Sequence, residues 1–91
     1  MARIHVSKPY TMPREAVREA VQALAEAAHS RHGVEPLWLG DSVSMKSRGV
    51  EGRLDFSGDT IDISVKLGLL ASAFAPKLKR EIQRYLDEHV T

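Results

Sequence analysis

Between residues 37 and 67 the chain is cut by three short glycine-containing turns, and this feature constrains the fold more than any other. The turns are Gly40-Asp41-Ser42, Arg48-Gly49 and Ser57-Gly58-Asp59-Thr60, and the segments between them alternate apolar with polar residues. A period of two is typical of strands that bury one face, and short glycine-containing loops join neighbouring strands. The region therefore predicts a four-stranded antiparallel meander with one apolar and one polar face.

The segments on either side of the meander predict one further strand and two helices. Residues 2–6 alternate and favour a first strand, while an apolar face from Val17 to Ala28 predicts a helix that runs to about Arg31. Thr11 is the expected N-cap of this helix. A second amphipathic helix is expected to carry Pro76 in its first turn.

The predicted order is β-α-β-β-β-β-α, a two-layer α+β domain with a mostly antiparallel sheet and both helices on its apolar face. We expect one domain over residues 1–91, because two independent cores would each be too small to fold. The first strand is expected to pair antiparallel with the last strand of the meander, because their directions are opposed. Parallel pairing with the second strand through a right-handed crossover is the alternative.

Composition argues against several classes of protein. The absence of cysteine excludes a disulfide framework and a thiolate metal site, and it favours a reducing, cytoplasmic setting. Thirteen basic and 12 acidic residues give a net charge of +1, which disfavours nucleic acid as a partner and predicts little electrostatic attraction to any other. No apolar run approaches the roughly 20 residues that a membrane span needs.

The residues that could do chemistry do not occur at the spacing of a catalytic, cofactor-binding or metal motif. His29 and His32 lie near a helix end and are interpreted as partial cations that suit a helix C-terminus. Glu51, Asp55 and Asp62 share the polar face of the meander with several cations, so we interpret them as cross-strand charge partners. The chain is therefore expected not to be an enzyme and to use no cofactor.

The stretch from Leu67 to Ala75 is too apolar for an ordinary loop. One interpretation is a buried hinge that docks the second helix, and the other is an exposed surface for a partner. Trp38 poses a similar question, because alternation with its leucine neighbours puts it on the polar face, although a neighbouring loop can also cover it. The candidate partner-binding residues are Trp38, Leu69, Leu70 and Phe74.

Five segments spread over nearly the whole chain carry a family resemblance. They are Ile4-His5-Val6, the alanine-rich helix, Gly49-Val50-Glu51-Gly52-Arg53, Leu67-Gly68-Leu69-Leu70 and Leu78-Lys79-Arg80-Glu81-Ile82. With them the chain resembles the polyhydroxyalkanoic acid system family, short bacterial proteins encoded beside genes for polyhydroxyalkanoate synthesis and granules. The resemblance implies a cytoplasmic protein of storage-polymer metabolism and carries over no catalytic residues. The layout is also similar to a shortened helix-grip domain, a fold that often holds apolar ligands.

Two hypotheses follow from the residues and the resemblance together. The first is a non-enzymatic accessory or binding domain whose partner is the polyhydroxyalkanoate granule surface, a granule protein or a second copy of the chain. The alternative is a small carrier or enzyme-like domain that holds an apolar acyl ligand between helices and sheet. The alternative predicts a cavity lined by Leu24, Phe56, Ile63 and Leu86, whereas a solid core favours the first hypothesis.

Overall fold

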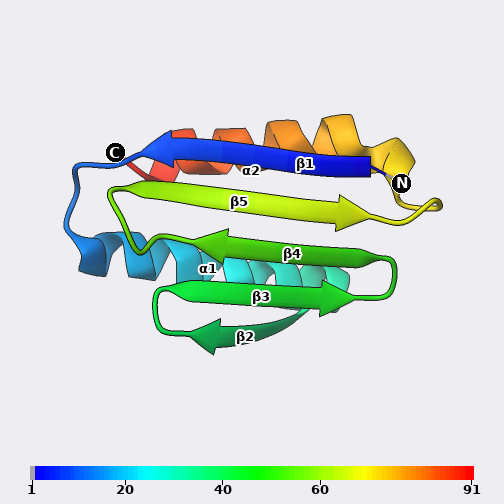
Figure 1. Ribbon diagram of the computed structural model, residues 1–91, viewed down its shortest axis with the longest axis horizontal. Coiled ribbons are helices and arrows are strands. Elements are labelled where there is room, and N and C mark those ends of the chain that lie inside the picture. The colour runs from blue at the N-terminus through cyan, green and yellow to red at the C-terminus, as the bar shows by residue number, and fades with distance from the viewer. Residues whose placement is uncertain (1) are drawn as a thin grey trace.

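The computed structural model describes residues 2–91 as a five-stranded antiparallel sheet with two helices on one face (Figure 1). This confirms the predicted α+β class and element order. The 3₁₀ turn η1 (Ser72–Phe74) immediately precedes the second helix. The strands are β1 (Ala2–Pro9), β2 (Glu35–Leu39), β3 (Ser42–Ser47), β4 (Val50–Asp55) and β5 (Thr60–Leu67), and the helices are α1 (Arg14–His32) and α2 (Ala75–His89).

The strand order is β1-β5-β4-β3-β2, so β1 and β2 form the two edges. Ile4 pairs with Val65 and Val6 with Ile63, which makes β1 antiparallel to β5. The predicted pairing of the first strand is therefore confirmed, and the parallel alternative is wrong. This arrangement places the first and last parts of the chain together, since α2 packs chiefly against β1.

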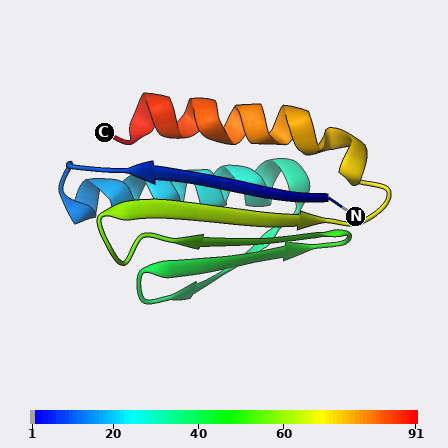
Figure 2. The same ribbon diagram turned by 45° about the horizontal axis from the view of Figure 1, so that its top comes forward.

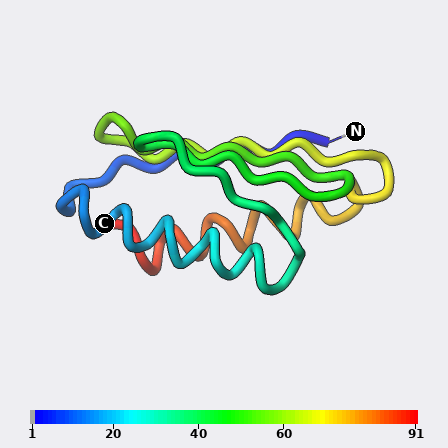
Figure 3. The backbone as a smooth tube through the Cα atoms, turned by 90° about the horizontal axis from the view of Figure 1, so that it is seen from below, coloured from blue at the N-terminus to red at the C-terminus, as the bar shows by residue number. Residues whose placement is uncertain are grey.

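Both helices cover the same face of the sheet and leave the other face open (Figure 3). The covered face and the helices bury one apolar cluster, in which the largest fully buried side chain is that of Phe56. The two helices also meet directly, because the Tyr85 hydroxyl donates to the carbonyl oxygen of Ala20 at 2.6 Å. Burial raises the pKa of Tyr85. The apolar alternation read from the sequence thus forms the core.

The end of α1 and the start of α2 agree with the sequence, whereas the start of α1 differs. Gly33 ends α1 with a φ of 67°, a conformation that suits glycine, and Pro76 lies in the first turn of α2. Pro13, at the N-cap, directly precedes α1. The prediction that Thr11 caps α1 is wrong, because its Oγ1 donates instead to the carbonyl oxygen of Thr91 at 2.9 Å.

The two ends of the sheet hold different connections (Figure 1). We call the end where the β1–α1, β2–β3 and β4–β5 connections meet the C-terminus the closed end; it comprises residues 10–14, 40–42, 56–59 and 90–91. At the opposite end, the connection from β5 to α2 projects past the strands (Figure 2). We call residues 68–74 of this connection the tip.

Candidate functional site

The tip begins where β5 ends. Leu67 is buried, and Gly68 then turns the chain away from the sheet while its N–H donates to the carbonyl oxygen of Gly49 at 2.8 Å. A Cβ at position 68 would lie 3.4 Å from that same carbonyl oxygen, which is an ordinary van der Waals contact. The bond ties the tip to the β3–β4 turn at one point and directs the following residues outward.

Three large apolar side chains of the tip face solvent. Leu69 is 82% exposed, Leu70 is 96% exposed and Phe74 is 64% exposed. The loop that carries them is held by its own bonds, since the Ser72 hydroxyl donates to the carbonyl oxygen of Leu69 at 2.9 Å and the Phe74 N–H donates to that of Ala71 at 3.0 Å. A local turn of this kind presents the side chains without burying them.

The buried-hinge interpretation is right for Leu67 and wrong for Leu69, Leu70 and Phe74. The connection passes the end of the sheet before α2 begins at Ala75. The small side chains of Ala71 and Ala75 pack against the apolar cluster, while the three large side chains face solvent.

Trp38 does not belong to the tip. It lies half-buried against the apolar cluster, where its ring meets that of Phe56 edge-on with 6.4 Å between centroids. The Arg18 guanidinium lies over both rings, 5.5 Å from each centroid. Trp38 therefore stands on the helix-covered face beside the closed end, and its predicted place on the polar face is wrong. The cover comes from Arg18 of α1 and from Phe56 at the start of the β4–β5 connection.

The neighbours of Trp38 occupy the open face in its place. Leu37 is 60% exposed and Leu39 is 64% exposed. Their partners across to β3 are Ser44 and Ser42, so each leucine stands beside a hydroxyl and not beside another apolar side chain of that strand. The two leucines are neighbours on one face of β2, and exposed leucines in such small numbers are common on protein surfaces. This exposed pair is not predicted by alternation, and its only signal in the sequence is the Leu-Trp-Leu run in a short strand.

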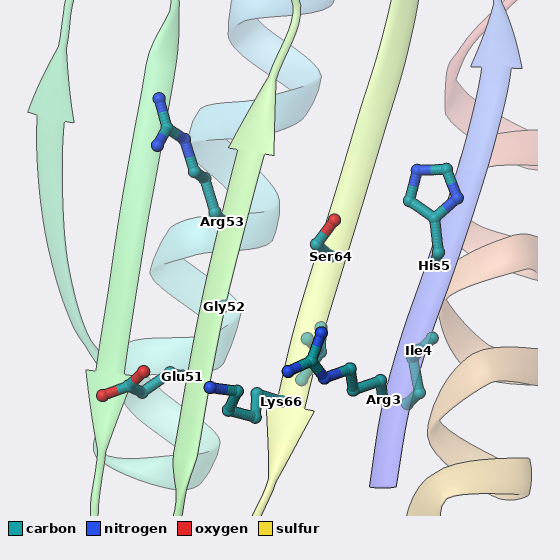
Figure 4. A pocket seen from close by; sticks show the side chains of 9 residues that line it. Arg3, Ile4, His5, Glu51, Gly52, Arg53, Ser64 and Lys66 are labelled. Atoms are coloured by element: carbon teal, nitrogen blue, oxygen red, sulfur yellow. The ribbon is translucent and has the colours of Figure 1, made fainter.

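The open face also carries a shallow depression of about 360 Å³ across β1, β5 and β4 (Figure 4). Arg3, His5, Arg53, Ser64 and Lys66 rise around it on neighbouring strands. A second depression of about 390 Å³ lies between β1 and α2. The carrier hypothesis expects a cavity lined by Leu24, Phe56, Ile63 and Leu86. The second depression is lined by Leu86, and the other three residues line neither depression.

From the first strand to the end of the second helix, the sequence matches one known family. The model of the family described as "Putative polyhydroxyalkanoic acid system protein" matches residues 4–90 of the 91 residues. The chain belongs to this family. No curated protein and no solved structure matches the chain, so its similarity to a helix-grip domain stays a prediction. Membership connects the chain to the polyhydroxyalkanoate system and assigns no residue a role.

In this family member two of the histidines take part in local contacts. The Nδ1 of His29 lies 2.9 Å from the carbonyl oxygen of Val34, just past the end of α1. His5 Nε2 lies 3.6 Å from Asp62 Oδ1 across β1 and β5. Within residues 2–91 no group of three or more His, Asp or Glu side chains is placed to hold a metal ion.

The carboxylates of the open face are spread along the strands. Asp55 and Asp62 are partners across β4 and β5, while Glu51 stands near the other end of β4 and pairs with Lys66. A hydrogen bond from the backbone N–H of Ser57 holds the pKa of Asp55 below its usual value. A general acid needs the opposite shift, so this carboxyl is tuned to remain an anion.

Within the described residues, neither helix is long and apolar enough to cross a membrane.

Proposed function

We propose that this domain is a non-enzymatic accessory protein that attaches to the surface of polyhydroxyalkanoate granules through its tip. The observation that carries the proposal is the exposure of Leu69, Leu70 and Phe74 on one short connection. Membership of the polyhydroxyalkanoic acid system family supplies the granule as the setting. Contiguous apolar surface on a small domain is typical of a contact site.

The size of the apolar surface is consistent with reversible attachment. Burying a leucine or phenylalanine side chain stabilises by about 1.5–3 kcal/mol relative to leaving it in water. Three such side chains therefore provide several kcal/mol before the cost of association is subtracted. The remaining binding free energy is small. A charged residue placed in the contact can therefore abolish binding, because burying an unpaired charge costs more than this.

The non-enzymatic part of the proposal is supported by the local contacts of the titratable groups. His29 contacts the end of its own helix, and His5 lies beside Asp62 on the open face. The pKa of Asp55 is lowered by the Ser57 amide. These contacts give the side chains structural roles, and the proposal requires no chemistry from them.

Leu70→Asp tests the contact, and Leu37→Asp is its matched control. Both leucines are exposed, so we expect both variants to keep the circular dichroism spectrum and thermal midpoint of the wild-type protein. Only Leu70→Asp is expected to lose co-sedimentation with isolated granules. A folded Leu70→Asp protein that binds granules as the wild type does would exclude the tip as the contact. Equal losses in both variants would point to a general effect of added charge.

A further inference from the structure

The tip lies in a stretch of chain that carries positive charge and no negative charge. Between Asp62 and Glu81 there is no acidic residue. Lys66 directly precedes the last residue of β5, and Lys77 lies three residues after Phe74 in the first turn of α2. The apolar side chains of the tip are thus bracketed in sequence by cations.

The fold adds cations from other elements. Arg3 pairs with Lys66 across β1 and β5, and Arg48 immediately precedes Gly49, whose carbonyl oxygen accepts the hydrogen bond that holds the tip. Figure 4 shows Arg3 extending from β1 toward β5, and Lys66 extending from β5 toward Glu51. We call these cations, together with two on α2, the collar. The collar consists of Arg3, Arg48, Lys66, Lys77 and Arg80.

The collar carries a positive excess that its surroundings do not neutralise. Glu51, opposite Lys66, and Glu81, beside Arg80, are the carboxylates nearest to it in register and sequence, which leaves an excess of three positive charges. Among residues 2–91, no member of the collar has a carboxylate oxygen within 4 Å. Such charges remain available to a partner.

The closed end has the opposite character. Arg14 within it and two cations beside it are paired, since Arg14 and Arg18 each contact Asp41 at 2.9 Å, and Lys8 contacts Asp87 at 2.9 Å. Further carboxylates lie in and beside the connections at this end. They are Asp55, Asp59, Asp62 and Glu88.

The charges of the collar and those of the closed end lie too far apart to affect each other. The molecule is 38 Å long. Charges at physiological salt are screened over about 8 Å, so a surface at the tip senses the collar and not the acidic end. The net charge of +1 therefore conceals a local charge that can attract a partner. The expectation that charge contributes little to binding a partner was based on the net charge of the whole chain, which does not show how the charges are distributed.

We infer that the tip attaches to a phospholipid interface with anionic head groups, into which its apolar side chains insert while the collar contacts the phosphates. This inference rests on the proposed function of the tip as the contact. Reversible attachment of a protein to such an interface commonly combines apolar insertion with basic residues, because either signal alone is weak. The tip and its collar supply both signals.

Two other occupants fit the charges less well. A second copy of the chain would bring collar against collar, and like charges oppose such a contact. A bare polyester surface is uncharged, so it would use Leu70 and its neighbours but would leave the collar without a role. Anionic head groups over an apolar interior engage both parts of the surface.

The test is co-sedimentation of the full chain with vesicles of phosphatidylcholine, with or without phosphatidylglycerol, at low and high NaCl. We expect binding to the anionic vesicles that weakens as salt is added. Leu70→Asp should abolish it. Replacing Lys66 and Lys77 by glutamine should weaken it by about fivefold per cation. Arg84→Gln is the matched control, because this exposed cation lies on α2 about 10 Å beyond Lys77, and its affinity should change by less than about twofold.

The outcomes separate this inference from the proposed function. Equal binding to neutral and anionic vesicles, or no effect of the Lys66 and Lys77 replacements, would overturn the inference while leaving Leu70-dependent granule attachment in place. A dimer in size-exclusion chromatography that Leu70→Asp dissociates would assign the tip to self-association and overturn it as well. Vesicle binding as expected, together with granule attachment that ignores Leu70, would instead remove the proposed function.

Discussion

At the closed end, three connections and the C-terminus are bonded to one another, whereas at the tip one backbone bond ties the connection to the sheet. The Tyr10 hydroxyl lies within hydrogen-bond distance of the carbonyl oxygens of Phe56 and Gly58, and the Phe56 N–H donates to the backbone carbonyl oxygen of Asp41 at 3.0 Å. The tip has the Gly68–Gly49 bond and the bonds within its own turn. The sheet therefore has one end whose connections are hydrogen-bonded to one another and one end whose connection has few such bonds.

The difference shows how a domain of 91 residues can spare apolar side chains for a partner. Total stability of a domain this size is of the order of 5–15 kcal/mol, so every buried side chain matters. Here the aromatic Phe56 is fully buried near the closed end, while Phe74 is exposed at the tip. Surfaces that bind partners are commonly drawn from the less stable parts of a fold. Substitutions at matched positions of the two ends test this division.

The largest expected effect compares the two phenylalanines. Phe56→Ala should destabilise the domain by about 3–5 kcal/mol, because it removes a fully buried ring and leaves a cavity. Phe74→Ala should change the unfolding free energy by less than about 0.5 kcal/mol, because the ring already faces solvent. Urea denaturation followed by circular dichroism measures both values. Similar losses would mean that the tip contributes to the core after all.

A smaller loss of stability is expected when a side-chain hydroxyl is removed. Tyr10→Phe should cost about 1–3 kcal/mol, because the buried carbonyl oxygen of Phe56 loses a donor. Ser72→Ala removes a side chain–backbone bond of similar length at the tip, but that bond is exposed to water and its loss should cost less than about 0.5 kcal/mol. Thermal unfolding of the two variants ranks them. A larger loss for Ser72→Ala would show that the turn of the tip, and not the closed end, is the region held by its hydrogen bonds.

The strands were predicted correctly where a long alternation of apolar and polar residues and the flanking turn residues indicated the same strand. In β5, the residues Ile61, Ile63, Val65 and Leu67 are buried, and the polar residues between them are exposed, as the alternation predicted. Eight consecutive residues fix the phase of such a strand, because a shift by one would expose its whole apolar set. The pairing of β1 with β5 followed from strand direction alone.

Alternation did not predict correctly which residues of β2 face the core, because the strand is short. β2 has five residues and three consecutive apolar ones, so Trp38 and its neighbours fit either face. Contact with Phe56 and Arg18 decides the matter, and neither residue is near Trp38 in sequence. The exposure of the tip could not be predicted from the sequence either, because it depends on where α2 meets the sheet. The separation of charge between the two ends could not be predicted, because it depends on which turns the fold brings together.

The smallest expected effect lies in the pH dependence of the closed end. The pKa of Asp55 is lowered chiefly by the hydrogen bond from the Ser57 N–H, so the native state favours the carboxylate more than the unfolded chain does. A lowered native pKa contributes stability above the unfolded pKa of about 4, and that contribution is lost as the pH falls through the native value. Asp55→Asn should therefore be slightly less stable than the wild type near pH 7, by less than about 0.5 kcal/mol because the group is exposed, and equally stable near pH 2. Urea denaturation at both pH values measures the difference. The control is the residue opposite Asp55 across the strands, Asp62, whose carboxylate would repel that of Asp55 if the two came close. Greater stability of Asp55→Asn than of the wild type near pH 7 would mean that such a repulsion outweighs the Ser57 bond, and would contradict the prediction.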